Sequence, residues 1–197
     1  MKILQIPITC DACKATFYTS SPVSQYIEDR YLDLKPIVKD KLAVVKHVCP
    51  NCGYTWYLIN NKKIVADSID EDIYSIYKKA FDTAINNTEK YDALSLWAWD
   101  LEYENKNDDA LKIRKQILDV LAAQIQDNPR IELVFIFIEN CRLLGEFDDA
   151  QKLIDNIDKD VEDHKDSHQQ MYDIFQYMKN LVAKKDTLPH LLSEVKR

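Results

Sequence analysis

Four cysteines arranged as two Cys-x-x-Cys pairs constrain this 197-residue chain more than any other feature. The first pair is Cys10 and Cys13, and the second is Cys49 and Cys52. A two-residue gap lets a turn aim both sulfurs at one point, so two turns can supply four tetrahedral ligands. Thiolates in this arrangement suit Zn²⁺, which binds sulfur at about 2.3 Å without a redox step. The pattern predicts one structural zinc ion bound by all four cysteines, with no open position for a substrate.

Residues 1–66 are predicted to form a small β domain of the zinc-ribbon type. Runs rich in β-branched and aromatic residues predict strands, and these runs are residues 14–19, 42–48, 54–59 and 62–65. The last two are separated by Asn60-Asn61, which is typical of a β-hairpin because Asn tolerates a positive φ. Gly53 fits the turn by which the chain leaves the second cysteine pair.

A long excursion, residues 20–41, separates the two cysteine pairs. Its composition is compatible with a short helix over residues 25–34. The 35 residues between Cys13 and Cys49 exceed the usual spacing in a zinc ribbon.

Residues 67–197 are predicted to form an all-helical domain, because apolar residues recur there with a helical period. Ser68 and Glu71 predict a capping box at its first helix. The expected helices cover residues 69–85, 90–105, 108–126, 129–144, 148–158 and 167–184, with a short last helix after Thr187. The expected fold class is therefore α+β, mainly α, with the β domain preceding the helices.

Two of the joints between these helices have similar sequences. Both place Asp-Asp-Ala at the start of the following helix, and the alanines, Ala110 and Ala150, are 40 residues apart. A small alanine allows close helix packing, and the acidic residues complement the helix dipole. The second joint also has Gly145 and Phe147, which resembles the joint of tetratricopeptide (TPR) repeats. The first joint has Asn107 in place of the aromatic residue, and the period exceeds the 34 residues of that family. The helical domain is thus predicted to be TPR-like.

The charge of the chain is unevenly distributed. Residues 1–66 contain nine Lys and Arg against five Asp and Glu, a balance of +4, whereas residues 67–197 contain 17 against 28, a balance of −11. An acidic chain is a poor general binder of nucleic-acid backbones, and an acidic helical surface favours a basic protein or peptide partner. No apolar segment is long enough to span a membrane. Because no signal peptide is recognisable and paired thiols persist in reducing compartments, the expected location is the cytoplasm.

Other candidate site residues have simpler interpretations. Cys141 lies in an apolar helical stripe and is expected to be a buried core residue rather than a nucleophile. His164 and His168 are four residues apart, as in a metal-binding pair, but they lack further ligands and are expected to lie in a solvated turn. With only Gly53 and Gly145 in the chain, a phosphate-binding loop is nearly excluded, and no catalytic motif appears. The chain is therefore not expected to be an enzyme.

An aromatic cluster follows the second cysteine pair and has two interpretations. Tyr54, Trp56 and Tyr57 could form a base-stacking platform for single-stranded nucleic acid. More often such a cluster fills the small core of a metal-bound sheet.

The arrangement as a whole resembles a bacterial cytoplasmic family known as a domain of unknown function. The segment from Cys49 to Tyr54, Cys-Pro-Asn-Cys-Gly-Tyr, matches its second knuckle, whereas the first knuckle here lacks the proline. In that family two knuckles precede a TPR-like helical region. The resemblance implies zinc binding and no established activity.

These observations favour a non-enzymatic interaction protein in which a zinc ribbon is joined to helices that bind a protein or peptide. The alternatives are a regulatory nucleic-acid binder acting through the ribbon, and a zinc-thiolate redox sensor. A hydrolase or transferase using the zinc is the least favoured, because it requires a cysteine to leave the metal.

Overall fold

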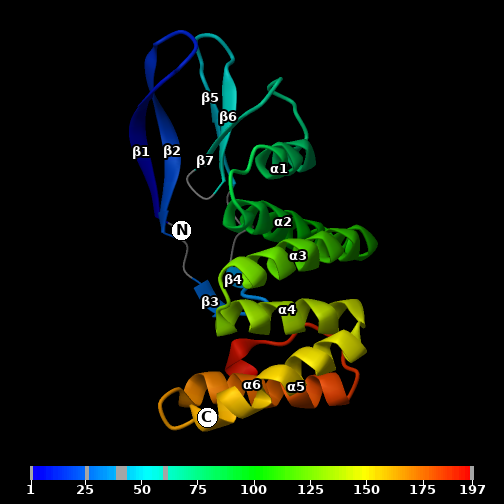
Figure 1. Cartoon of the computed structure of the whole chain (residues 1–197). Coiled ribbons are helices and arrows are strands. Elements are labelled where there is room, and N and C mark those ends of the chain that lie inside the picture. Colours follow the sequence, from blue (N-terminus) through cyan, green and yellow to red (C-terminus); the bar gives the residue numbers. More distant parts are fainter. Residues whose placement is uncertain (1, 25–26, 39–43, 60–61, 196–197) are drawn as a thin grey trace. The chain divides into compact units, whose positions relative to one another are not determined.

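The computed structural model describes residues 2–24, 27–38, 44–59 and 62–195 and has a mixed α+β fold (Figure 1). The chain divides into two compact units. Unit 1 consists of Met1–Tyr26 and Val38–Asn105, and unit 2 consists of Ile27–Ile37 and Lys106–Arg197. Part of the excursion between the cysteine pairs thus belongs to a different unit from the cysteines themselves. The sequence-based division at residue 66 follows the change from strands to helices, and as a domain boundary it stays a prediction.

The strands of unit 1 form two antiparallel groups. β1 (Lys2–Thr9) pairs with β2 (Thr16–Ser24). A second sheet has the order β5-β6-β7, built from β5 (Val45–Val48), β6 (Thr55–Ile59) and β7 (Lys62–Val65). The first cysteine pair lies in the β1–β2 connection and the second in the β5–β6 connection. The predicted hairpin is confirmed by the β6–β7 pairing, whereas its turn, Asn60-Asn61, lies outside the described residues.

Two helices complete the part of unit 1 that the structure describes. They are α1 (Ile73–Asp82) and α2 (Asn87–Tyr103), and α1 packs on the β5-β6-β7 sheet. Their shared core is apolar and contains Tyr57, Ile59, Ile64, Ala66, Ile76, Tyr77, Ala80 and Ala93. The burial of Trp56 and Tyr57, each 5% exposed, identifies the aromatic cluster mainly as core.

The capping box predicted at Ser68 and Glu71 is wrong. α1 begins at Ile73, with Asp72 at its N-cap position. The carboxylate of Glu71 instead accepts a hydrogen bond from the backbone N–H of Asp67, and the Glu71 N–H donates to the carbonyl of Ser68. The Ser-x-x-Glu pattern therefore stabilises a turn that precedes the helix rather than its first turn.

The helix predicted over residues 25–34 is also wrong, in the part of it that the structure describes. Residues 27–38 form a two-stranded sheet, β3 (Ile27–Arg30) and β4 (Pro36–Val38), joined by a turn in which the Tyr31 N–H donates to the carbonyl of Lys35. Leu34 has a φ of 68°, outside the helical region. The turn places Leu32 in the core of unit 2, and this tertiary burial outweighs local helix propensity.

Unit 2 contains four α-helices among its described residues, and they match the predicted set. They are α3 (Asn107–Asp127), α4 (Ile131–Leu144), α5 (Phe147–Asp163) and α6 (Gln169–Ala183). α5 runs five residues beyond its predicted end, and the expected last helix is a 3-10 turn, η1 (Leu192–Glu194). The core lies between α4, α5 and α6 and includes Ile138, Ile154 and Phe175, all fully buried. None of the described helices is long and apolar enough to cross a membrane.

The two similar joints also share a backbone conformation. Asn105 and Gly145 both have a positive φ, 59° and 77°. The next residues, Lys106 and Glu146, have nearly equal angles, φ −90° and ψ 56° against φ −83° and ψ 58°. The alanines that follow, Ala110 and Ala150, are buried, as the packing argument requires. The two joints therefore share a local backbone structure as well as a sequence pattern. The TPR-like arrangement of whole helices stays a prediction.

Gly145→Ala is expected to lower the free energy of unfolding by about 1 kcal/mol or more, because the φ of 77° is strained for any residue with a Cβ. Space is not the cause, since an added Cβ would meet the Phe147 ring at an ordinary 3.9 Å. Urea unfolding of the variant measures the loss. Gly145→Asn is the matched control and should lose less, because Asn tolerates the left-handed region. Equal stability of Gly145→Ala and the wild type would contradict this assignment.

The C-terminal segment of unit 2 is fixed by a small polar cluster. Nδ1 of His190 lies 2.8 Å from a Glu194 oxygen, its Nε2 lies 3.1 Å from an Asp186 oxygen, and the Tyr177 hydroxyl donates to Glu194 at 2.9 Å. The pKa of Glu194 is lowered chiefly by the His190 hydrogen bond, and that of Asp186 chiefly by the backbone N–H of Leu188.

The cluster predicts loosening of the C-terminal segment at acid pH. Because the pKa values of Asp186 and Glu194 are depressed in the folded state, their stabilisation is present above about pH 4 and is lost as pH falls through the folded values. The methyl signals of Leu192 in NMR spectra should move towards random-coil positions over this range. Glu194→Gln should reduce that pH dependence. Signals that stay unchanged down to pH 2 would argue against this role of the cluster.

Candidate metal centre

The first cysteine pair forms a tight turn between β1 and β2. The backbone N–H of Cys10 donates to the carbonyl of Ala15, and the N–H of Lys14 donates to the carbonyl of Cys10, both at 2.9 Å. Lys14, directly after Cys13, has a φ of 63°. The backbone N–H of Ala15 faces the Cys13 sulfur and lowers its pKa.

The second pair repeats this turn between β5 and β6. The N–H of Cys49 donates to the carbonyl of Tyr54, and the N–H of Gly53 donates to the carbonyl of Cys49, both at 2.9 Å. Gly53 has a φ of 72°, so the predicted role of this glycine in leaving the turn is confirmed. The two connections are therefore equivalent, although only the second has glycine at the left-handed position.

The two turns bring the four cysteines together. Their sulfurs all lie within 4.8 Å of one another. Two of the contacts join one turn to the other, 3.7 Å between Cys10 and Cys52 and 3.6 Å between Cys13 and Cys49. These separations far exceed the S–S bond of about 2.05 Å in a disulfide, and all four thiols are free. The group can hold a metal ion, and no second group of three or more potential ligands exists among the described residues.

The sulfurs differ in exposure and in charge. Cys10 and Cys49 are buried, Cys13 is half-buried and Cys52 is exposed. The side-chain amide of Asn51 donates to Cys13 at 3.4 Å and is the main cause of a pKa lowered to about 6. The Tyr54 N–H favours the Cys52 thiolate, but desolvation by its neighbours and the other three sulfurs raise the pKa of Cys52 to about 12. All four sulfurs can therefore be thiolates at neutral pH only when a cation neutralises them.

An aromatic cluster supports the turns from the sheet side. The Trp56 ring stacks on His47 at 5.3 Å between centroids and meets the edge of Phe17 at 6.2 Å. Lys63 on β7 lies 4.4 Å from the centroid of Trp56 and forms an ion pair with Asp11 inside the first turn. Trp56 thus contacts side chains of both strand groups, and its own ring is buried.

His47 of β5 contacts a neighbouring strand rather than a sulfur. Its Nδ1 lies 3.1 Å from the Thr19 hydroxyl of β2. Burial, followed by the charge of Lys63, lowers the pKa of His47. The neutral imidazole therefore joins β2 to β5.

The remaining candidate residues lie outside this centre. Cys141 is fully buried, and burial raises the pKa of its thiol to about 12, which fits an inert core residue. His164 and His168 are exposed, as expected for a solvated turn, and Nδ1 of His164 lies 2.8 Å from the backbone carbonyl of Asp160.

The sequence interpretation missed a buried polar network in unit 2. The Arg114 guanidinium donates to Asp33 at 2.6 Å and to the side-chain oxygen of Asn140 at 2.9 Å, and both ion-pair side chains are 4% exposed. Next to it, Arg142 forms two hydrogen bonds with Glu139, at 2.8 and 2.6 Å, where burial raises the pKa of the carboxyl. Asp33 comes from the excursion between the cysteine pairs, so this ion pair fixes the excursion to the helices.

Comparison of the chain with models of protein families, with curated proteins and with solved structures gave no significant match.

Proposed function

We propose that the four cysteines bind one structural Zn²⁺ and that the protein acts as a non-enzymatic interaction module. The sulfur cluster carries this proposal. Four ligands at about 2.3 Å from a tetrahedral centre are about 3.8 Å apart. The Cys10–Cys52 and Cys13–Cys49 contacts, 3.7 and 3.6 Å, are close to that value, and soft thiolates favour Zn²⁺ over the hard cations that prefer oxygen.

Four protein ligands leave no coordination site for water or substrate, which supports a structural role for the metal. The interaction role is supported by the charge of the chain. Residues 67–197 have a balance of −11, and helices in unit 2 present acidic side chains to solvent. Such a surface suits a partner with a basic segment.

Metal analysis of the purified full-length chain tests the first part of the proposal. We expect one zinc per chain in the wild type and none in a Cys10→Ser, Cys49→Ser double variant. Cys141→Ser is the matched control and should keep the full zinc content, because Cys141 lies outside the cluster. A metal-free wild type, after growth with zinc and purification without chelators, would contradict the proposal.

A second candidate, a zinc-thiolate redox sensor, is favoured by the exposure of Cys52. In this scheme the Cys52 thiolate attacks one oxygen of hydrogen peroxide, the O–O bond breaks, and the other oxygen leaves as water, which gives a sulfenate. The Cys10 thiolate, 3.7 Å away, then forms a disulfide bond with Cys52. The sulfenate oxygen takes up two protons from solvent and leaves as a second water, and Zn²⁺ is released. Stoichiometric hydrogen peroxide should then release zinc to a chromophoric chelator and produce a Cys10–Cys52 disulfide in peptide mass spectra. Retention of zinc in excess peroxide would exclude the sensor and leave the structural role intact.

A further inference from the structure

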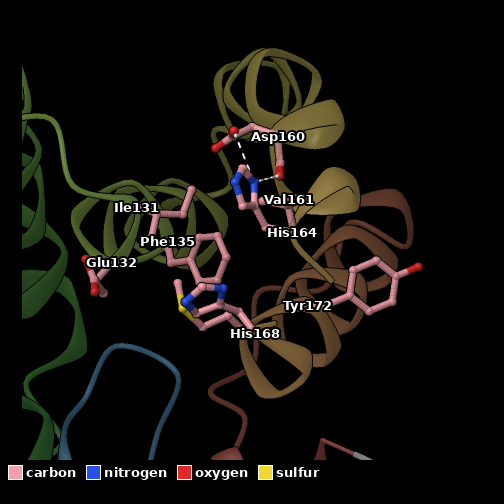
Figure 2. Close-up of a pocket in the computed structure, with 9 residues that line it drawn as sticks. Ile131, Glu132, Phe135, Asp160, Val161, His164, His168 and Tyr172 are labelled. Atoms are coloured by element: carbon pink, nitrogen blue, oxygen red, sulfur yellow. Dashed lines mark hydrogen bonds and ion pairs between the residues drawn. The ribbon is translucent and has the colours of Figure 1, made fainter. Parts of the chain in front are cut away.

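A pocket of about 280 Å³ opens between α4, α5 and α6, within unit 2 (Figure 2). Its apolar wall comes from all three helices: Ile131, Phe135, Val161 and Met171. The remaining lining residues are polar or aromatic: Glu132, Asp160, His164, His168 and Tyr172. Beneath it, Phe135 stacks on Phe175 with ring centroids 5.6 Å apart, so the wall is part of the ordered core.

The size and chemistry of the pocket restrict its occupant. Its volume lies just below the roughly 300–1,000 Å³ of typical small-molecule sites, so it suits one large side chain better than a whole cofactor. Two histidines line the pocket, but the described residues contain no group of three potential metal ligands there. A metal ion is therefore not the expected occupant. The apolar wall favours an aromatic or a long aliphatic side chain.

An acidic hollow adjoins the pocket along α5. Tyr172 lines both, and Figure 2 shows its hydroxyl pointing away from the pocket. The hollow has four carboxylates and two lysines in its lining, namely Asp155, Asp158, Glu162, Asp163, Lys159 and Lys179. Lys179 pairs with Asp158 at 2.6 Å, and Lys165, just outside the lining, pairs with Glu162 at 2.7 Å. With Lys165 included, a net charge of about −1 remains at neutral pH. α5 as a whole has seven acidic residues and two lysines.

We propose that the pocket and the hollow together bind a short basic peptide segment, with a large apolar side chain in the pocket and Lys or Arg side chains over the hollow. This inference rests on the proposed interaction role and names the chemistry of the partner. The apolar side chain provides most of the affinity, because burial of a large side chain contributes more than exposed ion pairs do. The carboxylates select a cationic partner and exclude acidic ones.

Titration of the ¹⁵N-labelled full-length chain with a capped Lys-Lys-Trp-Lys-Lys peptide tests the proposal by NMR. We expect the amide signals of Val161, Met171 and Tyr172 to shift together as the peptide concentration is raised to about 1 mM. A Lys-Lys-Ala-Lys-Lys peptide should bind about tenfold more weakly or worse, because it lacks the apolar side chain. A Glu-Glu-Trp-Glu-Glu peptide should cause no shifts at these residues.

Two variants separate the pocket from the hollow. Ile131→Lys places a cation at the pocket wall and should weaken binding of the tryptophan peptide at least tenfold. Asp155→Asn with Asp163→Asn should weaken it several-fold and flatten its salt dependence. Leu188→Lys, at an exposed apolar residue outside the pocket, is the matched control. It should change neither the affinity for the tryptophan peptide nor the salt dependence of binding. Thermal melts of each variant show whether the fold is retained.

Equal binding of the tryptophan and alanine peptides, equal binding of the acidic peptide, or no shift at the pocket would overturn the proposal. A basic partner that binds elsewhere on the chain would also overturn it while leaving the interaction role intact. Loss of zinc has no direct effect on these residues, so a metal-free protein with α4–α6 folded should still bind the peptide.

Discussion

Cys49→Ser is expected to unfold the strands of unit 1 and to leave α3–α6 folded. The β1–β2 and β5–β6 connections meet at the sulfurs, and a two-stranded ribbon such as β1–β2 is at best marginally stable by itself. Structural zinc contributes on the order of 10–16 kcal/mol to the folding of small finger peptides, so loss of the proposed zinc would remove a contribution larger than the stability of most small domains. In ¹H–¹⁵N spectra the signals of β1, β2 and β5 should collapse towards random-coil positions.

The response of α1 in unit 1 shows how far the loss of the metal spreads from the strands. α1 shares its core with β6 and β7, so we expect α1 to loosen together with the sheet, whereas α3–α6 have a separate core. Addition of a strong chelator to the wild type should reproduce the effect of the variant, and excess zinc should reverse it. Cys141→Ser should leave the strand signals dispersed. Strand signals that stay dispersed in metal-free protein would show that the sheet does not depend on the metal.

Arg114→Met is expected to lower the free energy of unfolding of unit 2 by about 3–5 kcal/mol. The substitution leaves the buried carboxylate of Asp33 without its ion pair to Arg114, and it removes the hydrogen bond to Asn140. The carboxylate keeps the hydrogen bond from the Lys35 N–H but loses its buried cation, which weakens the attachment of residues 27–37 to the helices. Trypsin should consequently cleave faster after Arg30.

Urea unfolding followed by helical circular dichroism measures this loss. Lys112→Met is the matched control, because Lys112 and Asp109 form an exposed ion pair with side chains 74% and 58% exposed. Its effect should stay within about 0.5 kcal/mol. Asp33→Asn combined with Arg114→Met should recover part of the stability, because no uncompensated charge remains buried. An Arg114→Met protein as stable as the control would show that the ion pair is not needed for the excursion to dock.

Local patterns predicted much of the fold. The cysteine turns, the β6–β7 hairpin and the helices of unit 2 follow from two-residue spacing, β-branched runs and a 3.6-residue period, which involve neighbours in sequence. β1 was not assigned, although the alternation of Ile6 and Ile8 with exposed neighbours is the signal that could have indicated it.

The excursion could not be predicted from such patterns. Asp33 and Arg114 are 81 residues apart, and no local signal links an acidic residue between two cysteine pairs to an arginine on a distant helix. The same holds for the pair of Lys63 with Asp11, which supports the metal centre from another strand. Local propensity favoured a helix over residues 25–34, but burial of Leu32 and the Asp33 ion pair selected a turn.

X-ray absorption at the zinc edge, measured on the purified full-length chain, tests the metal centre most directly. The geometry of the four cysteines predicts one zinc per chain with four sulfur neighbours at about 2.3 Å and no nitrogen or oxygen in the coordination shell. A chain without zinc, or a zinc ion with a water or histidine among its ligands, would contradict a closed structural site formed by Cys10, Cys13, Cys49 and Cys52.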